Sequence, residues 1–317
     1  MSEPIGLCLI GAGAIAERHL QAYEELGGVD PRWVISRPEE SAKNFASRWN
    51  FAHLDASIEP ALADPAVQLV LIASPSPLHC EQAILALRAG KDVIVEIPVG
   101  LNLADAQAVA QVATEFGRRV WVCHTLRSTV ALRLVRQQVQ SGELNLTHID
   151  GYFGIPRRRN QGMDGVAIRS WIDNLLWHHG CHQVDAALWV LGMPSVTRVQ
   201  SLTGPVHPTF GMALDVGVQF RTEGGQLVTQ SLSYNVAEPI WQLRFIGHED
   251  ALTFINGRLT NEAGHELVPD NSTSNLIGQN RALLHAFRTG EPSDFDLLKI
   301  LPTMEVLGLA QSSADAG

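Results

Sequence analysis

A short stretch, WHHGCHQVD, ends at Asp185 and holds more groups capable of proton transfer than any other part of the chain. It contains three imidazoles, His178, His179 and His182, and the Asp185 carboxylate. An imidazole exchanges a proton near neutral pH because its unperturbed pKa is about 6.5. At about 100° per residue, an α-helix would place His178, His182, Asp185 and Trp189 on one face. We expect that face to line a cleft.

General acid-base catalysis is the leading interpretation of this stretch. We predict that His182 is the base, that Asp185 orients its imidazole, and that His178 and His124 donate hydrogen bonds to substrate. The i, i+4 spacing of His178 and His182 is also that of the HExxH zinc enzymes. The glutamate of that motif is replaced by His179, so no metal is expected. A purely structural histidine pair remains an open alternative.

Composition limits the class of protein. With 317 residues the chain is long enough for two domains. The net charge of -10 argues against a nucleic-acid-binding surface, and no apolar run reaches the ~20 residues of a membrane span. The N-terminal residues lack the features of a secretory signal, and the four cysteines form no CxxC pair. We therefore expect a cytoplasmic protein without disulfides.

A glycine-rich turn near the N-terminus predicts a dinucleotide-binding site. An apolar run is followed by Gly11 and Gly13, with Ala16 at the third position of a G-x-G-x-x-A fingerprint. Gly11 permits the turn, Gly13 lets the backbone approach a pyrophosphate, and Ala16 packs helix on strand. Ala14 and Ile15 in the same turn are also expected to contact the cofactor, and the amphipathic helix predicted from Glu17 to Leu26 would turn its N-terminus toward the phosphates.

The second predicted strand ends at Ser36 and Arg37. Here a dinucleotide-binding fold meets the adenosine ribose, and an acidic residue would select NAD. A hydroxyl and a guanidinium would instead bind a 2′-phosphate by charge-assisted contacts. The sequence therefore predicts NADP as cofactor, although Arg37 could also be an ordinary solvated side chain.

Helical and strand-like segments alternate as far as Cys123 and predict a doubly wound parallel sheet of the α/β class. We expect an NADP-binding domain over residues 1–122 and a substrate-binding and oligomerisation domain over residues 123–317. In such sheets, ligands lie beyond the carboxyl ends of the strands. The residues expected near the cofactor in the turns after two later strands are Ser74, Pro75, Ser76, His79, Glu96 and Ile97.

Beyond Cys123 the pattern changes to strands whose apolar residues alternate, as from Met212 to Phe220. This predicts an α+β domain with an open, mainly antiparallel sheet. One face of that sheet must cover helices, and the other could meet a second subunit in a homodimer.

Several arginines stand out in this acidic chain. Residues 157 to 159 are all arginine, and Arg169 precedes the histidine stretch. Such a run is often a solvated surface. Alternatively Arg127, Arg158 and Arg169 clamp the carboxylates of a small dicarboxylate substrate by bidentate contacts.

These motifs occur in the order seen in the Gfo/Idh/MocA oxidoreductases, which the chain resembles over nearly its whole length. The resemblance rests on Gly11 to Gly13, Ser74 to Ser76 with His79, Glu96 to Pro98, and the helix with His182 and Asp185. It implies an N-terminal Rossmann domain and a C-terminal domain with an open antiparallel sheet.

Further blocks resemble a branch of that family that serves the breakdown of aromatic compounds. They are Val95 to Pro98, His124-Thr125, Arg169 to Trp171 and Leu175 to His179. The resemblance implies NADP-linked oxidation of a cyclic hemiacetal.

Two positions depart from the pattern of the wider family. Ile97 replaces its usual lysine, and His178 stands where many members have aspartate. A sugar or polyol dehydrogenase, or a non-catalytic NADP-binding regulator, are the alternatives.

Overall fold

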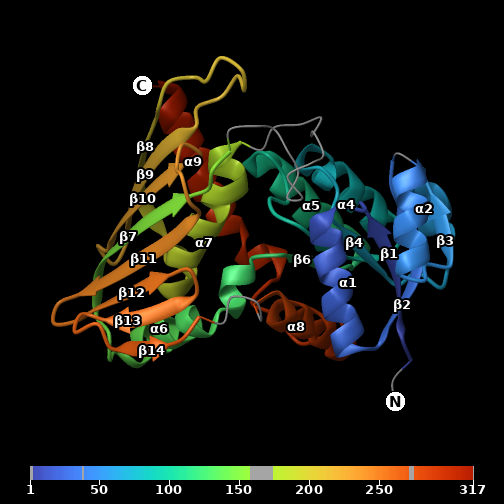
Figure 1. The fold of residues 1–317 in the computed structure, drawn as a ribbon, viewed down its shortest axis with the longest axis horizontal. Coiled ribbons are helices and arrows are strands. Elements are labelled where there is room, and N and C mark those ends of the chain that lie inside the picture. Colours follow the sequence, from blue (N-terminus) through green and yellow to red (C-terminus); the bar gives the residue numbers. More distant parts are fainter. Residues whose placement is uncertain (1–2, 38, 158–173, 271–274, 317) are drawn as a thin grey trace. The chain divides into compact units, whose positions relative to one another are not determined.

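The computed structural model describes residues 3–37, 39–157, 174–270 and 275–316. It divides into two compact units, and each is described separately (Figure 1). The first unit joins Met1–Cys123 to Leu276–Lys299, and the second joins His124–Asn275 to Ile300–Gly317. The chain first passes from one unit to the other after Cys123, one residue beyond the expected end of the first domain at residue 122. The expected uninterrupted domain over residues 123–317 differs from this division, because residues 276–299 pack with the first unit.

The first unit contains a six-stranded sheet in which every described pair of neighbours is parallel. Its order, β3-β2-β1-β4-β5-β6, is that of a dinucleotide-binding fold. Central strands β1 and β4 are apolar and buried throughout, as expected when helices cover both faces of a parallel sheet. The strands are β1 (Ile5–Ile10), β2 (Val29–Ile35), β3 (His53–Asp55), β4 (Leu69–Ile72), β5 (Asp92–Val95) and β6 (Val120–Val122).

The described residues of the first unit form six α-helices, and the last comes from the far end of the chain. They are α1 (Ala14–Leu26), α2 (Glu39–Arg48), α3 (Glu59–Ala63), α4 (His79–Arg88), α5 (Leu103–Phe116) and α8 (Asn275–Thr289). Leu283 and Leu284 of α8 share one apolar core with Leu20 and Tyr23 of α1. Arg119 holds the end of α8 by donating to the carbonyl of Ala286 at 2.9 Å. The end of α8 is therefore fixed to the edge of the first sheet.

The second unit is built on an eight-stranded sheet of order β14-β13-β12-β11-β7-β10-β9-β8. Within the described residues, β7 and β10 form its single parallel pair, so the predicted, mainly antiparallel sheet is confirmed. The strands are β7 (Leu146–Gly154), β8 (Val196–Thr203), β9 (Asp215–Thr222), β10 (Leu227–Ser233), β11 (Ile240–Gly247), β12 (Ala251–Ile255), β13 (Arg258–Asn261) and β14 (Glu266–Val268).

Three helices, α6 (Val130–Ser141), α7 (Cys181–Val190) and α9 (Leu301–Ala316), cover one face of this sheet (Figure 1). The burial pattern agrees, because Val216, Val218 and Phe220 of β9 are buried while Gly217 and Gln219 are exposed. The predicted alternation is thus confirmed where it falls on β9. Its start at Met212 precedes the strand.

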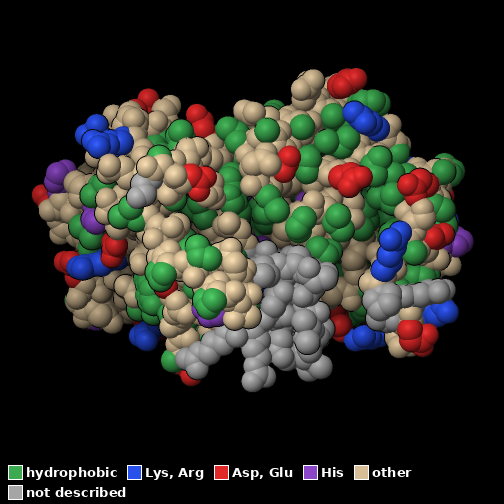
Figure 2. Space-filling view, turned by 90° about the horizontal axis from the view of Figure 1, so that it is seen from above, with side chains coloured by type: hydrophobic (Ala, Val, Ile, Leu, Met, Phe, Trp, Pro, Cys, Tyr) green, Lys and Arg blue, Asp and Glu red, His purple; other side chains and the backbone are tan. Residues whose placement is uncertain are grey.

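Side chains at the surface are mixed in charge. On the face shown in Figure 2, the described lysines and arginines are scattered singly among acidic and apolar groups. No helix in the described part of the chain is both long and apolar enough to cross a membrane. Three of the four cysteines are buried and the fourth, Cys80, is partly buried; all are free thiols.

Candidate active site

The glycine turn after β1 has the geometry that a dinucleotide phosphate requires. Gly11 has a φ of +102° and donates its N–H to the Ile35 carbonyl at 2.8 Å. A Cβ on Gly11 would lie 2.5 Å from the Ala73 carbonyl oxygen, so a larger residue cannot fit. A Cβ on Gly13 would point into open space at the N-terminus of α1. The turn therefore leaves room for a phosphate beside the first backbone N–H groups of the helix.

The other residues predicted to contact the cofactor here differ in exposure. Ala16 is fully buried, Ala14 is exposed and Ile15 is partly buried. At the end of β2, the Ser36 N–H donates to the Asp55 carbonyl at 3.2 Å, and the Arg37 side chain is exposed. Binding of a 2′-phosphate by these two residues stays a prediction.

The turn after β4 is held together by a buried histidine. His79 is 1% exposed, and its ring nitrogens lie 2.8 Å from the carbonyl oxygens of Pro98 and Ser74. The Ser74 hydroxyl donates to Gln82 at 2.5 Å, and Ser76 is buried. Both ring nitrogens of His79 lie against backbone carbonyl oxygens. The expected contact of His79 with the cofactor would therefore have to be made by its ring carbon atoms.

The turn after β5 contains an isoleucine in place of the family's usual lysine. Ile97 is 6% exposed, and its peptide bond to Pro98 is cis. The preceding Glu96 carboxylate is partly buried and lies 2.7 Å from the Nε2 atom of His19, a residue of α1. The sequence did carry a signal for His19. It shares the i, i+3, i+4, i+7 spacing of Ala16, Leu20 and Tyr23, the buried face of α1.

The histidine stretch begins with a π-helical turn, Leu176–Gly180, before α7 starts at Cys181. The Asn174 side chain accepts hydrogen bonds from the N–H groups of Leu176 and Trp177 at 3.0 and 3.2 Å. A π-helical turn has more residues per turn than an α-helix and is frequent at functional sites. The angular position predicted for His178 on a regular helix is therefore wrong.

Helix α7 is buried on nearly every side, and of the face expected to line a cleft only His178 and His182 are partly exposed. Asp185 and Trp189, which were assigned to that face, are 0% and 2% exposed. His182 is the only side chain of α7 that is not buried. The exposure expected for Asp185 and Trp189 is wrong, because a helical wheel cannot distinguish side chains that face solvent from side chains that face other buried groups.

Asp185 lies at the centre of a closed hydrogen-bonded cluster in the second unit. Arg127 donates to both carboxylate oxygens, from Nε at 2.8 Å and from Nη2 at 2.6 Å. The Thr303 hydroxyl donates at 2.9 Å, and Nδ1 of His124 lies 3.3 Å away. Burial would raise the pKa of Asp185, but the Arg127 and His124 charges and the hydrogen bonds outweigh it, so the pKa is lowered.

This cluster gives two of the predicted residues partners that were not anticipated. Arg127 is 1% exposed and pairs with Asp185, so a bidentate clamp on substrate would compete with an existing bidentate pair. Asp185 was expected to orient His182, and the partners seen are Arg127, Thr303 and His124. Thr303 comes from α9, and no local motif pointed to it.

His182 lies between two aromatic rings of the second unit. The imidazole of His124 meets it edge to face, with ring centroids 5.6 Å apart and planes at 86°. The Trp241 ring lies 5.4 Å away on β11, and its indole N–H donates to Gln183 at 3.1 Å. The structure therefore brings together His182 and His124, and Asp185 contacts His124 directly.

The other two histidines belong to a neighbouring aromatic group. His178 and His179 meet edge to face at 4.5 Å, and His179 stacks on Phe153 at 4.7 Å. Nδ1 of His179 lies 2.7 Å from the hydroxyl of Tyr234, over whose ring the Arg157 guanidinium lies at 5.2 Å. His179 is thus a packing residue, and one arginine of the predicted basic run lies beside it. Arg158 and Arg169 lie outside the described residues.

The fold and these motifs identify the class of protein. Residues 5–124 match the model of an oxidoreductase family with an NAD-binding Rossmann fold, and residues 131–272 match that of the C-terminal domain of bacterial oxidoreductases. The chain belongs to the Gfo/Idh/MocA family of oxidoreductases.

Among its relatives is 4-carboxy-2-hydroxymuconate-6-semialdehyde dehydrogenase of Sphingobium sp. (strain SYK-6). The two are 32% identical over 310 residues, which cover 95% of this chain and 96% of the relative. Inositol 2-dehydrogenase of Streptomyces avermitilis is 26% identical over 74% of this chain and 67% of its own length. The crystal structure of GenD2 from gentamicin A biosynthesis in complex with NAD has a TM-score of 0.86 at 22% identity. It covers 99% of this chain and 95% of GenD2, and supports the fold alone.

Proposed function

We propose that the protein is an NADP-dependent dehydrogenase that oxidises the cyclic hemiacetal form of 4-carboxy-2-hydroxymuconate-6-semialdehyde to 2-pyrone-4,6-dicarboxylate. The observation that carries this proposal is the similarity to a dehydrogenase named for that semialdehyde. The two sequences are 32% identical over 95% of this chain. The similarity spans both units and includes the histidine stretch. The reaction belongs to the ring-cleavage breakdown of protocatechuate.

His182 is the proposed base. Oxidation of a hemiacetal to a lactone removes a hydride from the anomeric carbon and a proton from its hydroxyl group. NADP⁺, when bound, supplies the acceptor for the hydride and its two electrons. His182 takes the proton. It can reach a substrate because it is the one α7 side chain that is not buried.

Two other side chains would orient that base. His124 packs edge to face against His182, and Asp185 lies 3.3 Å from Nδ1 of His124. Arg127 and Thr303 hold the Asp185 carboxylate, so the surroundings of His182 are fixed before substrate arrives. Rigid placement of a base against the reacting atom lowers the entropic part of the barrier.

A substrate with two carboxylates would need positive charge near the base. Arg158 and Arg169 are the proposed contacts, with His178 as a hydrogen-bond donor. Ile97 supports a substrate other than a simple polyol, because it lacks the amine that the wider family has at this position.

For the cofactor, Gly11 permits the tight turn, Gly13 leaves space for the pyrophosphate, and Ser36 and Arg37 would bind the 2′-phosphate. The exposed guanidinium of Arg37 supports NADP over NAD.

The experiment is a spectrophotometric assay of nicotinamide reduction by the purified full-length chain. The semialdehyde is compared with myo-inositol, scyllo-inositol and glucose, each with NADP⁺ and with NAD⁺. We expect kcat/KM for the semialdehyde with NADP⁺ to exceed every other combination by about tenfold or more. A polyol that is oxidised faster would replace the proposal with a polyol dehydrogenase. Cofactor binding without turnover of any of them would favour a non-catalytic regulator.

A further inference from the structure

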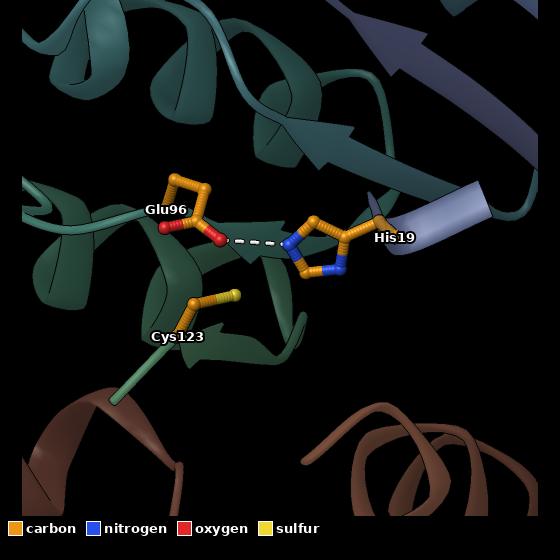
Figure 3. A group of neighbouring side chains, drawn as sticks. All are labelled: His19, Glu96 and Cys123. Atoms are coloured by element: carbon orange, nitrogen blue, oxygen red, sulfur yellow. Dashed lines mark hydrogen bonds and ion pairs between the residues drawn. The ribbon is translucent and has the colours of Figure 1, made fainter. Parts of the chain in front are cut away.

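Beneath the turn that follows β5, the first unit contains a group of polar side chains from three elements (Figure 3). His19 comes from α1, Glu96 follows β5 and Cys123 follows β6. The His19 side chain is fully buried. Its Nε2 atom lies 2.7 Å from Oε1 of Glu96, and its Nδ1 atom lies 2.9 Å from Oδ1 of Asn280 on α8.

The hydrogen-bond partners fix how many protons this group holds. Asn280 donates its side-chain N–H to the Leu276 carbonyl at 2.9 Å, so the atom facing His19 is its oxygen, an acceptor. Nδ1 of His19 must therefore carry a proton. The contact between Nε2 and Glu96 needs one more, because two lone pairs at 2.7 Å would repel each other. The second carboxylate oxygen of Glu96 accepts from the Ile97 N–H at 3.2 Å. His19 and Glu96 thus share one buried proton.

A second buried histidine holds the other end of the same turn. Two carbonyl oxygens, of Pro98 and Ser74, flank the ring of His79 at 2.8 Å each. His19 and Glu96 tie the start of the Glu96–Pro98 turn to α1, and His79 ties its end to the turn after β4. Helix α1 begins directly at the glycine turn. Helix α1 after the glycine turn, the turn after β4 and the Glu96–Pro98 turn are therefore joined through two buried imidazoles.

We propose that His19 and Glu96 are positioning residues for the cofactor. Their shared proton fixes the Glu96–Pro98 turn against α1, so that losing either side chain lowers the affinity for the cofactor more than it lowers the stability of the fold. His79 does the same at the other end of the turn. The inference rests on the use of a nicotinamide dinucleotide and not on the identity of the substrate.

The same group resembles a metal site in one respect. Ligand-type atoms of His19, Glu96 and Cys123 all lie within 4.8 Å of one another, the only such place among the described residues. Burial and the charge of Glu96 raise the pKa of the Cys123 thiol well above its usual value, so the sulfur keeps its proton. A zinc ion bound by both His19 and Glu96 at about 2.0 Å would hold their ligand atoms more than about 3 Å apart. Nε2 and Oε1 are 2.7 Å apart. A shared proton therefore accounts for the geometry better than a cation.

The test is a double-mutant cycle on NADP⁺ affinity, measured by calorimetry on the full-length chain without substrate. His19→Asn and Glu96→Gln should each weaken NADP⁺ binding by about tenfold. The double variant should bind NADP⁺ no more weakly than the single variant with the lower affinity, because the two substitutions remove the same interaction. Glu96→Gln is nearly isosteric, so it keeps the test valid if His19→Asn folds poorly. The matched control is His285→Asn, which removes an exposed histidine that lies 3.1 Å from Glu291 in the same unit.

Three outcomes would overturn the inference: variants that bind NADP⁺ within about twofold of the wild type, additive losses, or an equal loss in the control. One equivalent of zinc in the purified wild type, absent from Glu96→Gln, would replace it with a metal site. Nitrogen NMR of histidine-labelled protein gives a direct signature, because both ring nitrogens of His19 should be bonded to, or share, a proton. If no substrate is oxidised, the binding measurements still decide this inference, so its failure and that of the proposed function are distinguishable.

Discussion

Each unit places a carboxylate beside an imidazole, but the two clusters differ in how completely they are closed. Asp185 is fully buried, and Arg127, Thr303 and His124 surround it. Glu96 is partly exposed, with 13% of its side chain accessible, and its main partner is a histidine with which it shares one proton. A guanidinium keeps its charge at every relevant pH, whereas an imidazole does not.

The difference indicates that one cluster stabilises the fold and that the other affects cofactor binding. A closed pair with a permanent cation resists change, so the Asp185 cluster fixes α7 and the helices packed around it. A partly open pair beside a turn that faces the predicted cofactor edge can affect binding without determining whether the unit folds.

The largest expected effect is on stability, from Asp185→Asn. The variant leaves the buried Arg127 guanidinium without its counter-charge, and breaking a buried ion pair in this way costs about 3–5 kcal/mol. Urea unfolding at pH 7 measures it. Glu96→Gln, the matching change in the first unit, should cost about 1 kcal/mol, the value of an ordinary hydrogen bond. Equal losses in the two variants would contradict the comparison.

The next effect is on turnover, from His182→Asn. Loss of a general base should lower kcat by about 10²-fold or more, while NADP⁺ affinity and the free energy of unfolding stay near those of the wild type. Steady-state kinetics with the semialdehyde measures it. His265→Asn, which changes an exposed histidine of the same unit, is the control. If His182→Asn retained wild-type turnover, another residue would have to be the base.

A smaller effect is expected on cofactor choice, from Arg37→Ser. Loss of one charge-assisted contact to the 2′-phosphate should weaken NADP⁺ binding by about tenfold and leave NAD⁺ binding unchanged. Calorimetric titration with both dinucleotides tests this, with Arg88→Ser, on the exposed side of α4, as the control. An equal loss of affinity for both dinucleotides would show that Arg37 does not bind the 2′-phosphate.

The smallest effect is on the pH dependence of stability. The pKa of Asp185 is lowered in the folded protein, so its contribution is complete above the unfolded value of about 3.9 and is lost as the pH falls through the folded value. The stability difference between the wild type and Asp185→Asn should therefore be constant from pH 5 to 8, within about 0.5 kcal/mol, and shrink below about pH 4. If the stability difference between the two proteins instead changed near pH 6.5, the pH dependence would come from a histidine, and His124 is the one beside Asp185.

Sequence predicted the fold well because its signals are local. The apolar strands, the glycine turn and the alternation in β9 each follow from a few neighbouring residues, and the doubly wound sheet is confirmed. Residues 276–299 could not be assigned to the first unit, because their partners lie far away in the chain.

The candidate site was only partly predictable. His182 stands out by type and spacing, but the π-helical turn before it changes the geometry that a regular helix implies. The partners of Asp185 come from α9 and from the segment before α6, and no sequence spacing relates them. A helical wheel shows which residues share a face, but not what covers it.

The central claim, oxidation at the hemiacetal carbon, has a direct isotopic test. The semialdehyde is labelled with deuterium at its aldehyde carbon and mixed with NADP⁺ and the full-length chain. We expect every molecule of NADPH formed to carry the deuterium and 2-pyrone-4,6-dicarboxylate to appear in equal amount. Deuterium released to water, or NADPH formed without the label, would contradict it.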